Sequence, residues 1–295
     1  MTMQTAHTLV TEQPVWLITG CSTGFGREIA TLAIERGFRT VVTARDASSL
    51  QEFASADNAL LLELDVTKSE DIARAMGAAE KHFGSVDVLV NNAGIGYFGA
   101  VEESEEAEIR KMFEVNFFGT SAMIHAVLAG MRQRRRGVIV NFSSIGGLRS
   151  FPAVGYYNAT KFAVEGLSEA LWQEVEPLGI RVMVVEPSGF RTDWAGRSAN
   201  EATLELADYV ATAGLWRTQV REISGKQAGD PARAAQAIVA AVESGNPPHH
   251  LLLGNAAFDG AMSKLAELRS DFLAGETVAR GADFPVVPRK LGLVA

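Results

Sequence analysis

The stretch "VWLITGCSTGFGREIA" (residues 15–30) contains a short apolar run, a glycine-rich turn and the beginning of a helical pattern. Gly20, Gly24 and Gly26 give the turn the spacing GxxxGxG. Gly20 lets the chain turn sharply off a strand, and Gly24 removes a side chain where a pyrophosphate would approach a helix N-terminus. Gly26 lets the helix pack closely against the strand. The stretch predicts the first unit of a dinucleotide-binding α/β fold, although such glycines also occur as ordinary tight-turn residues.

The rest of the chain repeats this alternation of strand and helix. Apolar runs that predict strands lie at 15–19, 40–44, 60–66, 86–90, 137–143, 180–187 and 250–254. Apolar residues at spacings of three and four, which predict helices, lie at 24–36, 69–83, 104–135 and 157–177. This alternation is typical of a parallel sheet covered by helices on both faces. We expect a single-domain, Rossmann-type, doubly wound α/β fold of about seven strands.

Three segments fall outside this pattern. Residues 14–254 are expected to form the domain, residues 1–13 a mobile leader, and residues 255–295 a C-terminal extension. The connection at 188–228 is too long for an ordinary loop between a strand and a helix. We expect residues 190–228 to form either a lid over a substrate or an interaction surface.

Composition limits the classes of function. The 295 residues carry a net charge of −8, which argues against nonspecific binding to nucleic acid or to an anionic membrane surface. No apolar run approaches the roughly 20 residues that a membrane span needs. The single cysteine, Cys21, excludes an intrachain disulfide and favours the cytoplasm, and we interpret it as a packing residue. The five histidines have no spacing suited to a shared metal site, so no metal is predicted.

The ends of the other strands also carry residues suited to a ligand. Asp65 follows the third strand in "ELDVT", and "NNAGIG" (91–96) ends the fourth with small residues. Open α/β sheets bind ligands at the edge where the carboxyl ends of parallel strands meet. Each feature alone also fits ordinary turn chemistry, but their agreement predicts a cofactor site. Its residues in these segments are Gly20, Ser22, Thr23, Gly24, Phe25, Gly26, Asp65, Val66, Asn92, Ala93 and Gly94.

The residue after the second strand indicates which cofactor binds. An acidic side chain there would hydrogen-bond the ribose of NAD, whereas this chain has Arg45 in "TVVTARD". A guanidinium binds phosphate bidentately, so we favour NADP(H), with NAD(H) as the alternative. The alternative for Arg45 is an exposed residue that leads into a helix. Asp46 is predicted to cap that helix, and Arg27 is a second, weaker phosphate contact.

The stretch "GYYNATKF" (155–162) begins a predicted helix with two tyrosines and a lysine. Tyr157 and Lys161 are four residues apart and share a helix face, whereas Tyr156 points more than a hundred degrees away. A nearby ammonium favours phenolate, so we expect Lys161 to lower the pKa of Tyr157. Ser144 ends the fifth strand at the same sheet edge, where its hydroxyl can hold a substrate oxygen. A turn-forming role is the alternative for Ser144.

Together, "TGCSTGFG", "NNAG", a serine thirteen residues before the tyrosine, and "YNATK" resemble the short-chain dehydrogenase/reductase family over about residues 14–254. The resemblance implies that Tyr157 is the general acid/base and that Lys161 tunes its pKa and contacts the cofactor ribose. It implies that Ser144 holds the substrate oxygen. It also implies that Asn116 in "EVNFFG" anchors a water that links Lys161 to solvent.

The same resemblance covers "PSGFRT" after the sixth strand. It implies that Phe190 and Thr192 hold the nicotinamide carboxamide and the diphosphate, and that Pro187 belongs to the cofactor site. Ser188 occupies a position where the family usually has glycine, which puts the local backbone path in question. The family also implies homodimers or homotetramers.

The resemblance implies hydride transfer between a nicotinamide cofactor and a carbonyl or secondary alcohol, with Tyr157 handling the proton. A small, apolar organic substrate is expected. The segment "EPSGFRTDW" and the C-terminal extension look similar to bacterial members near the steroid- and retinol-dehydrogenase branch. Two alternatives are an inactive nucleotide-sensing protein and a nucleotide-sugar epimerase or dehydratase. The residues that would line an aromatic pocket, or else pack the core, are Tyr97, Phe98, Phe151, Tyr156, Trp194 and Trp216.

Overall fold

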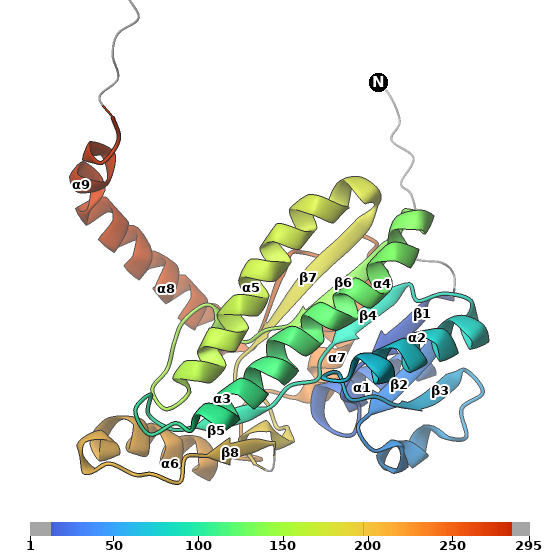
Figure 1. The fold of residues 1–295 in the computed structure, drawn as a ribbon, viewed down its shortest axis with the longest axis horizontal. Helices are drawn as coiled ribbons and strands as arrows, with labels where there is room; N and C mark the ends of the chain where they lie inside the picture. The colour runs from blue at the N-terminus through green and yellow to red at the C-terminus, as the bar shows by residue number, and fades with distance from the viewer. Residues whose placement is uncertain (1–12, 197, 285–295) are drawn as a thin grey trace, which may run out of the picture.

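Seven parallel strands form the central sheet of the computed structural model, which describes residues 13–196 and 198–284 (Figure 1). They lie in the order β3-β2-β1-β4-β6-β7-β9. Their bounds are β1 (Val15–Ile18), β2 (Arg39–Ala44), β3 (Ala59–Glu63), β4 (Val88–Asn91), β6 (Gly137–Phe142), β7 (Ile180–Pro187) and β9 (His250–Leu253). All seven predicted strands and the doubly wound order are confirmed. The chain proceeds outward from β1 to β3 and returns past β1 to β4, so the topological switch point lies between β1 and β4.

Helices cover both faces of the sheet because its strands are buried on both sides (Figure 1). In β1, Trp16 and Ile18 belong to one core, and Val15 and Leu17 to the other. This is why β1 is a continuous apolar run rather than an alternating one. The helices over the first core are α1 (Gly24–Glu35) and α7 (Pro231–Glu243), and those over the second are α2 (Ser69–Phe83), α4 (Thr120–Arg134) and α5 (Gly155–Val175).

The helix predicted at 104–135 consists of three consecutive helical segments. They are α3 (Glu106–Phe113), the π-helix η2 (Glu114–Gly119) and α4. Among the described residues, this rod from Glu106 to Arg134 is the one helix with the length and hydropathy of a membrane span. Its Met123, Ile124 and Val127 are buried in the second core, as in the core helix of a globular domain.

The long connection after β7 is folded rather than irregular. It contains the 3₁₀ helices η5 (Asp193–Ala195) and η6 (Ala207–Tyr209), the strand β8 (Ala199–Glu201), the π-helix η7 (Val210–Gly214) and α6 (Leu215–Glu222). Strand β8 pairs in parallel with β5 (Gly96–Phe98) to form a second, two-stranded sheet. This small sheet was not predicted, because strands of three residues are too short to show a period in the sequence.

The segment after β9 is helical up to Gly281 apart from short turns. It forms α8 (Asn255–Ala274) and α9 (Glu276–Gly281), which project away from the sheet (Figure 1). Gly254, the last residue assigned to the predicted domain, has a φ of +91° and turns the chain into α8. The predicted leader, apart from Gln13, lies outside the described residues, and so do residues 285–295 of the predicted extension.

Candidate active site

The glycine turn between β1 and α1 is packed too tightly for side chains. Gly20 has a φ of +72° and Gly24 a φ of +58°, values that favour glycine. A Cβ on Gly26 would lie 2.4 Å from the Gly20 carbonyl oxygen and from Asn92 Nδ2. The Asn92 amide donates to that carbonyl at 3.0 Å, which ties the turn to the end of β4. A Cβ on Gly24 would lie 3.2 Å from Thr192, so the turn also meets the segment after β7.

The N-terminus of α1 is open to an anion. Its N-cap residue, Thr23, makes no side-chain capping hydrogen bond, and no acidic residue lies in the first turn. Ser22 beside it is exposed. The first N–H groups of a helix attract phosphate when no side chain occupies them. Phe25 packs on Phe142 and Phe190, with ring centroids 5.3 and 5.0 Å away, and so holds the helix start against β6 and the loop after β7.

The end of β2 presents one arginine to solvent. Arg45 is exposed, and no hydrogen bond or ion pair joins it to another residue in the described part of the chain. Asp46 accepts a hydrogen bond from Ser48 N at 2.9 Å and caps the 3₁₀ helix η1 (Ala47–Phe53), as predicted. Arg27 forms an ion pair with Glu52. Arg45 is therefore the guanidinium left available at this corner of the predicted site.

The other predicted cofactor residues lie along the same sheet edge. Asp65 accepts hydrogen bonds from Thr67 N at 3.0 Å and from Thr67 Oγ1 at 2.7 Å, so its carboxylate also shapes the turn after β3. Val66 is buried. The Ala93 N–H donates to Thr19 Oγ1 at 3.0 Å, which fastens the end of β4 to β1.

Three of the predicted catalytic side chains come together where β6 ends and α5 begins. The Ser144 hydroxyl lies close enough to the Tyr157 phenol to lower the pKa of that phenol. Lys161 Nζ lies 5.6 Å from the centroid of the Tyr157 ring and donates to the Phe142 carbonyl oxygen at 2.8 Å. Tyr156 and Tyr157 both pack against the cluster of Tyr97 and Met112, but only Tyr157 also contacts Lys161. The structure thus places Tyr157, and not Tyr156, beside Lys161.

The expected direction of the Tyr157 pKa was wrong. Burial raises the pKa of Tyr157 to about 12, and the Ser144 hydroxyl lowers it only in part. Burial also lowers the pKa of Lys161 to about 8, so the ammonium is itself costly to keep charged in this site. Desolvation of the phenolate outweighs the attraction of the nearby lysine. The phenol is consequently protonated at neutral pH.

Asn116 lies in the π-helical turn η2 and is buried. Its Oδ1 accepts from Ile95 N at 2.8 Å, and its Nδ2 donates to Ile95 O at 2.9 Å and to Thr160 Oγ1 at 3.2 Å. A Cβ on Gly94 would lie 3.4 Å from Asn116 Oδ1 and 3.8 Å from Lys161 Nζ. The wide turn therefore brings Asn116 next to Lys161, with the bare backbone of Gly94 between them.

The segment after β7 keeps a regular path through Ser188. Pro187 pairs with Leu253 in the sheet, and the next residue, Ser188, continues the contact by donating from its N–H to Leu253 O at 3.0 Å. The Ser188 hydroxyl donates to the same oxygen at 3.4 Å. The Phe190 backbone pairs with Gly229, and Thr192 caps η5 by accepting from Trp194 N at 3.4 Å. The serine found in place of glycine thus strengthens the local hydrogen bonding.

Four of the six predicted aromatic residues gather around Tyr157. Trp194 packs on the Tyr157 ring at a centroid distance of 4.8 Å and meets Phe98 edge-on at 5.5 Å. Trp216 stacks on Phe151 at 5.9 Å. The other two, Tyr97 and Tyr156, pack with Met112 of α3 in a cluster that Tyr157 also contacts.

A titratable cluster behind Lys161 was not predicted. His250 Nδ1 lies 2.5 Å from Glu186 Oε1 and 3.9 Å from Glu165 Oε2. Two signals were present in the sequence. Glu165 lies four residues after Lys161, on the face that Tyr157 shares. Glu186 is an acidic residue among the apolar residues Val182–Val185 and Pro187 of β7. Cys21, in contrast, is buried with a pKa raised to about 12, in agreement with its interpretation as a packing residue.

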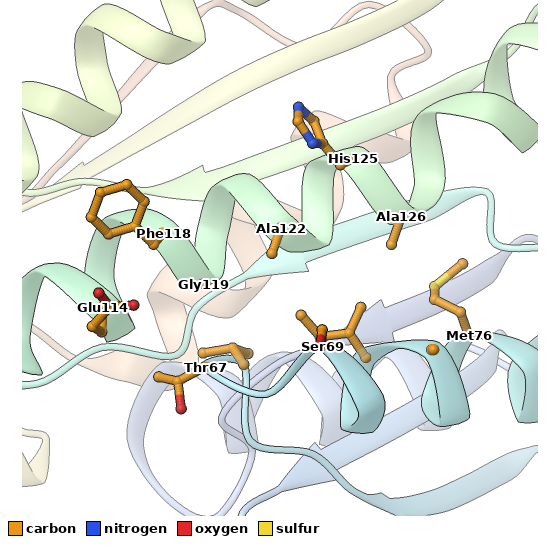
Figure 2. A pocket seen from close by; sticks show the side chains of 12 residues that line it. Thr67, Ser69, Met76, Glu114, Phe118, Gly119, Ala122, His125 and Ala126 are labelled. Carbon is orange, nitrogen blue, oxygen red and sulfur yellow. The ribbon is translucent and has the colours of Figure 1, made fainter.

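A hollow of about 610 Å³ lies away from the predicted catalytic residues, between α2 and the η2–α4 helix (Figure 2). Ser69 and Met76 line it from α2, and Phe118, Ala122 and His125 line it from the opposite helix (Figure 2). Its lining includes none of Ser144, Tyr157 and Lys161.

Known proteins are similar to this chain over most of its length. The chain is 39% identical over 239 residues to a 3-ketodihydrosphingosine reductase of Bacteroides thetaiotaomicron, covering 81% of this chain and 87% of the relative. A short-chain dehydrogenase structure from Streptomyces avermitilis superposes with a TM-score of 0.86 at 41% identity, covering 92% of this chain and 99% of that one.

Solved structures with bound cofactor are also similar. An alcohol dehydrogenase from Thermococcus sibiricus in complex with 5-hydroxy-NADP has a TM-score of 0.68 at 26% identity, over 82% of this chain and 96% of that one. A 3-ketoacyl-(acyl-carrier-protein) reductase from Brucella melitensis in complex with NADH has a TM-score of 0.69 at 28% identity, over 83% of this chain and 96% of that one. These neighbours support a nicotinamide cofactor. The short chain dehydrogenase family profile matches residues 14–203, and this chain belongs to that family of oxidoreductases.

Proposed function

We propose that this protein is an NADP(H)-preferring dehydrogenase/reductase that interconverts a carbonyl and a secondary alcohol on a small, apolar organic substrate. The observation that carries the proposal is the meeting of Ser144, Tyr157 and Lys161 at the carboxyl edge of the sheet, beside Gly94. When bound, the nicotinamide supplies or accepts the hydride, and its oxidised ring adds a positive charge.

The residues present fit such a cofactor. The glycines of the first turn leave backbone where the pyrophosphate would approach, and the uncapped N-terminus of α1 offers N–H groups to it. Asp65, Val66, Asn92, Ala93 and Gly94 would hold the adenosine and ribose side along the sheet edge. Pro187, Phe190 and Thr192 would hold the nicotinamide side.

The chain's own contribution is to orient and protonate the substrate. Ser144 donates a hydrogen bond to the substrate oxygen, and Tyr157 delivers its phenolic proton to the same oxygen as the carbonyl is reduced. The raised pKa of Tyr157 keeps that proton in place at neutral pH, which suits the reducing direction. Lys161, with Asn116 beside it, stabilises the phenolate that remains.

The cofactor preference rests on Arg45. Its guanidinium is exposed at the tip of β2, and no acidic residue of the described chain pairs with it. A 2′-phosphate would supply that partner. NAD(H) is the alternative cofactor.

Access to the substrate rests on residues 190–228, which we propose to act as a lid. Trp194 and Trp216 bring aromatic surface from this segment onto the Tyr157 region, which suits an apolar substrate. We further propose that the protein works in the cytoplasm as a homodimer or homotetramer. Phe118 in η2 and Phe162 in α5, which are 52% and 45% exposed, provide apolar surface for such contacts.

The experiment that tests the proposal is a panel of ketones and secondary alcohols assayed with NADPH, NADH and their oxidised forms. Turnover of a ketone with NADPH supports it. Tight cofactor binding without turnover of any compound would favour the inactive nucleotide-sensing alternative. Conversion of a nucleotide sugar without net cofactor oxidation would favour the epimerase or dehydratase alternative.

A further inference from the structure

Three titratable side chains meet behind Lys161, each from a different element. Glu165 lies on α5, Glu186 on β7 and His250 on β9. The Glu186 side chain is fully buried and Glu165 nearly so, whereas half of the His250 side chain is exposed. His250 Nδ1 lies 2.5 Å from Glu186 Oε1 and 3.9 Å from Glu165 Oε2. The cluster therefore reaches from the protein interior to solvent.

The cluster is connected to the catalytic helix face. Tyr157, Lys161 and Glu165 follow one another at intervals of four residues along α5, so they share one face of the helix. The Ser143 hydroxyl lowers the pKa of the neighbouring Glu165 carboxyl and lies 3.5 Å from the Lys161 carbonyl oxygen. The Glu165 charge acts directly on Lys161 and favours its protonated form.

The cluster does not hold all of its charges at once. Glu165 Oε1 and Glu186 Oε2 are buried and have no hydrogen-bond partner among the described residues. Two carboxylates that are close together and desolvated retain a proton at pH values where isolated carboxylates lose it. Burial and the neighbouring Glu186 raise the pKa of Glu165 to about 7, and the bond to Glu186 raises the pKa of His250. Because the three groups lie within contact of one another, they bind and release protons as a coupled set.

The groups that face the cluster come from α5, β7 and β9. Glu165 faces Glu186, His250 and Lys161, and His250 also faces Glu169. The next histidine, His249, shares its contact with Trp172 with His250 but pairs with a different carboxylate. It stacks on Trp172 at 4.2 Å and pairs with Glu176 at 2.6 Å.

We propose that Glu165, Glu186 and His250 form a proton-exchanging cluster that sets the charge of Lys161 and couples it to solvent through His250. The three are positioning residues, since they act on the reaction through Lys161. Without the Glu165 carboxylate, the pKa of Lys161 is set by burial alone, so the lysine loses its proton at lower pH. For its catalytic meaning, the inference rests on the proposed function.

The test is a titration of Lys161 by NMR in the free protein, in the presence of a metal chelator. The chain has seven lysines, so selective ¹³C labelling of lysine gives few signals, and Lys161→Arg identifies the one of interest. We expect Glu165→Gln to shift the Lys161 pKa downward and Glu165→Asp to restore part of the shift. His250→Asn should shift it in the same direction by a smaller amount, and the matched variant His249→Asn should leave it unchanged.

An unchanged Lys161 titration in Glu165→Gln, or equal titrations in His250→Asn and His249→Asn, would overturn the inference. If Glu165→Gln does not fold, the inference is tested by comparing the Lys161 pKa in His250→Asn with that in His249→Asn. A merely structural role would lower stability without moving the Lys161 pKa. In active enzyme, the alkaline limb of the kcat/KM profile should move to lower pH in Glu165→Gln. Because the titration needs no turnover, an enzyme that reduces no carbonyl would refute the proposed function and leave this inference standing.

Discussion

The ring of Trp194 lies 4.8 Å from the ring of Tyr157, so an aromatic side chain from the segment after β7 covers the phenol. Trp194 is seated on the backbone of β5, since a Cβ on Gly96 would lie 3.0 Å from Trp194 Cε2. The pairing of β8 with β5 holds this arrangement in place. In the proposed function, substrate access to Tyr157 therefore depends on how firmly the whole segment is attached.

Besides these packed contacts, residues 190–228 are attached by hydrogen bonds at the surface, which gives the first prediction. Thr203 N donates to Glu105 at 3.0 Å and Tyr209 Oη donates to Glu102 at 2.6 Å, both in exposed positions. Segments held by exposed hydrogen bonds open more easily than core strands. Backbone amides there should exchange faster than those of β6 in the free protein, and slow markedly with NADPH and a substrate analogue. Full protection without ligand, unchanged on adding both, would instead indicate a permanent subunit interface.

Tyr157→Phe should reduce kcat by about 100- to 10,000-fold, because the proton donated to the substrate oxygen is lost. Cofactor affinity should stay within a few-fold, since the ring and its contact with Trp194 are retained. Steady-state kinetics and a fluorescence titration with NADPH measure the two effects. The matched control is Tyr156→Phe, which should have a mild effect. A severe loss in the control with a mild effect at Tyr157 would contradict the assignment of the acid.

Arg45→Ala should weaken NADPH binding by about 1.5–3 kcal/mol, the range of a charge-assisted hydrogen bond, and barely change NADH binding. Arg27→Ala serves as the control, because Arg27 is already paired with Glu52. Its effect on NADPH should be clearly smaller. Dissociation constants for both cofactors provide the measurement. Equal losses for NADPH and NADH would show that Arg45 does not discriminate, and a wild type that prefers NADH would refute the preference.

Gly26→Ala should destabilise the fold by about 1–3 kcal/mol, because the added methyl group would overlap the Gly20 carbonyl and the Asn92 amide. Gly77 in α2 is the control. It lies in a helix interior, and a Cβ added there meets nothing within 4 Å. Gly77→Ala should stabilise by about 0.5–1 kcal/mol. Urea unfolding of the three proteins measures both changes, and equal effects would show that close packing at Gly26 is unimportant.

The Glu165 carboxyl should make stability depend on pH. Its pKa is raised from 4.5 to about 7 in the folded protein, so the folded state binds this proton more tightly than the unfolded chain does. Stability should therefore fall as pH rises from about 4.5 to about 7, by up to about 3 kcal/mol. Glu165→Gln should remove most of this slope in urea unfolding, whereas the exposed Glu174→Gln should keep it. The same slope in both variants would argue against a raised pKa at Glu165.

Local patterns in the sequence determined the strands, the glycine turn and the choice between the two tyrosines. The strands are buried on both faces, so their apolar runs are visible in the sequence. The glycines are required by the turn itself, and helical periodicity alone places Tyr157 rather than Tyr156 beside Lys161.

Tertiary structure alone decided the pairing of β5 with β8, the contact of Trp194 with Tyr157, and the cluster around Glu165. Each joins residues that are far apart in the chain, and no local period encodes such a meeting. The pKa of Tyr157 belongs here too. The lysine four residues away predicted a lowered Tyr157 pKa. Burial instead raises this pKa, because every side chain around the phenol helps to exclude water from it, and only the folded structure brings those side chains together.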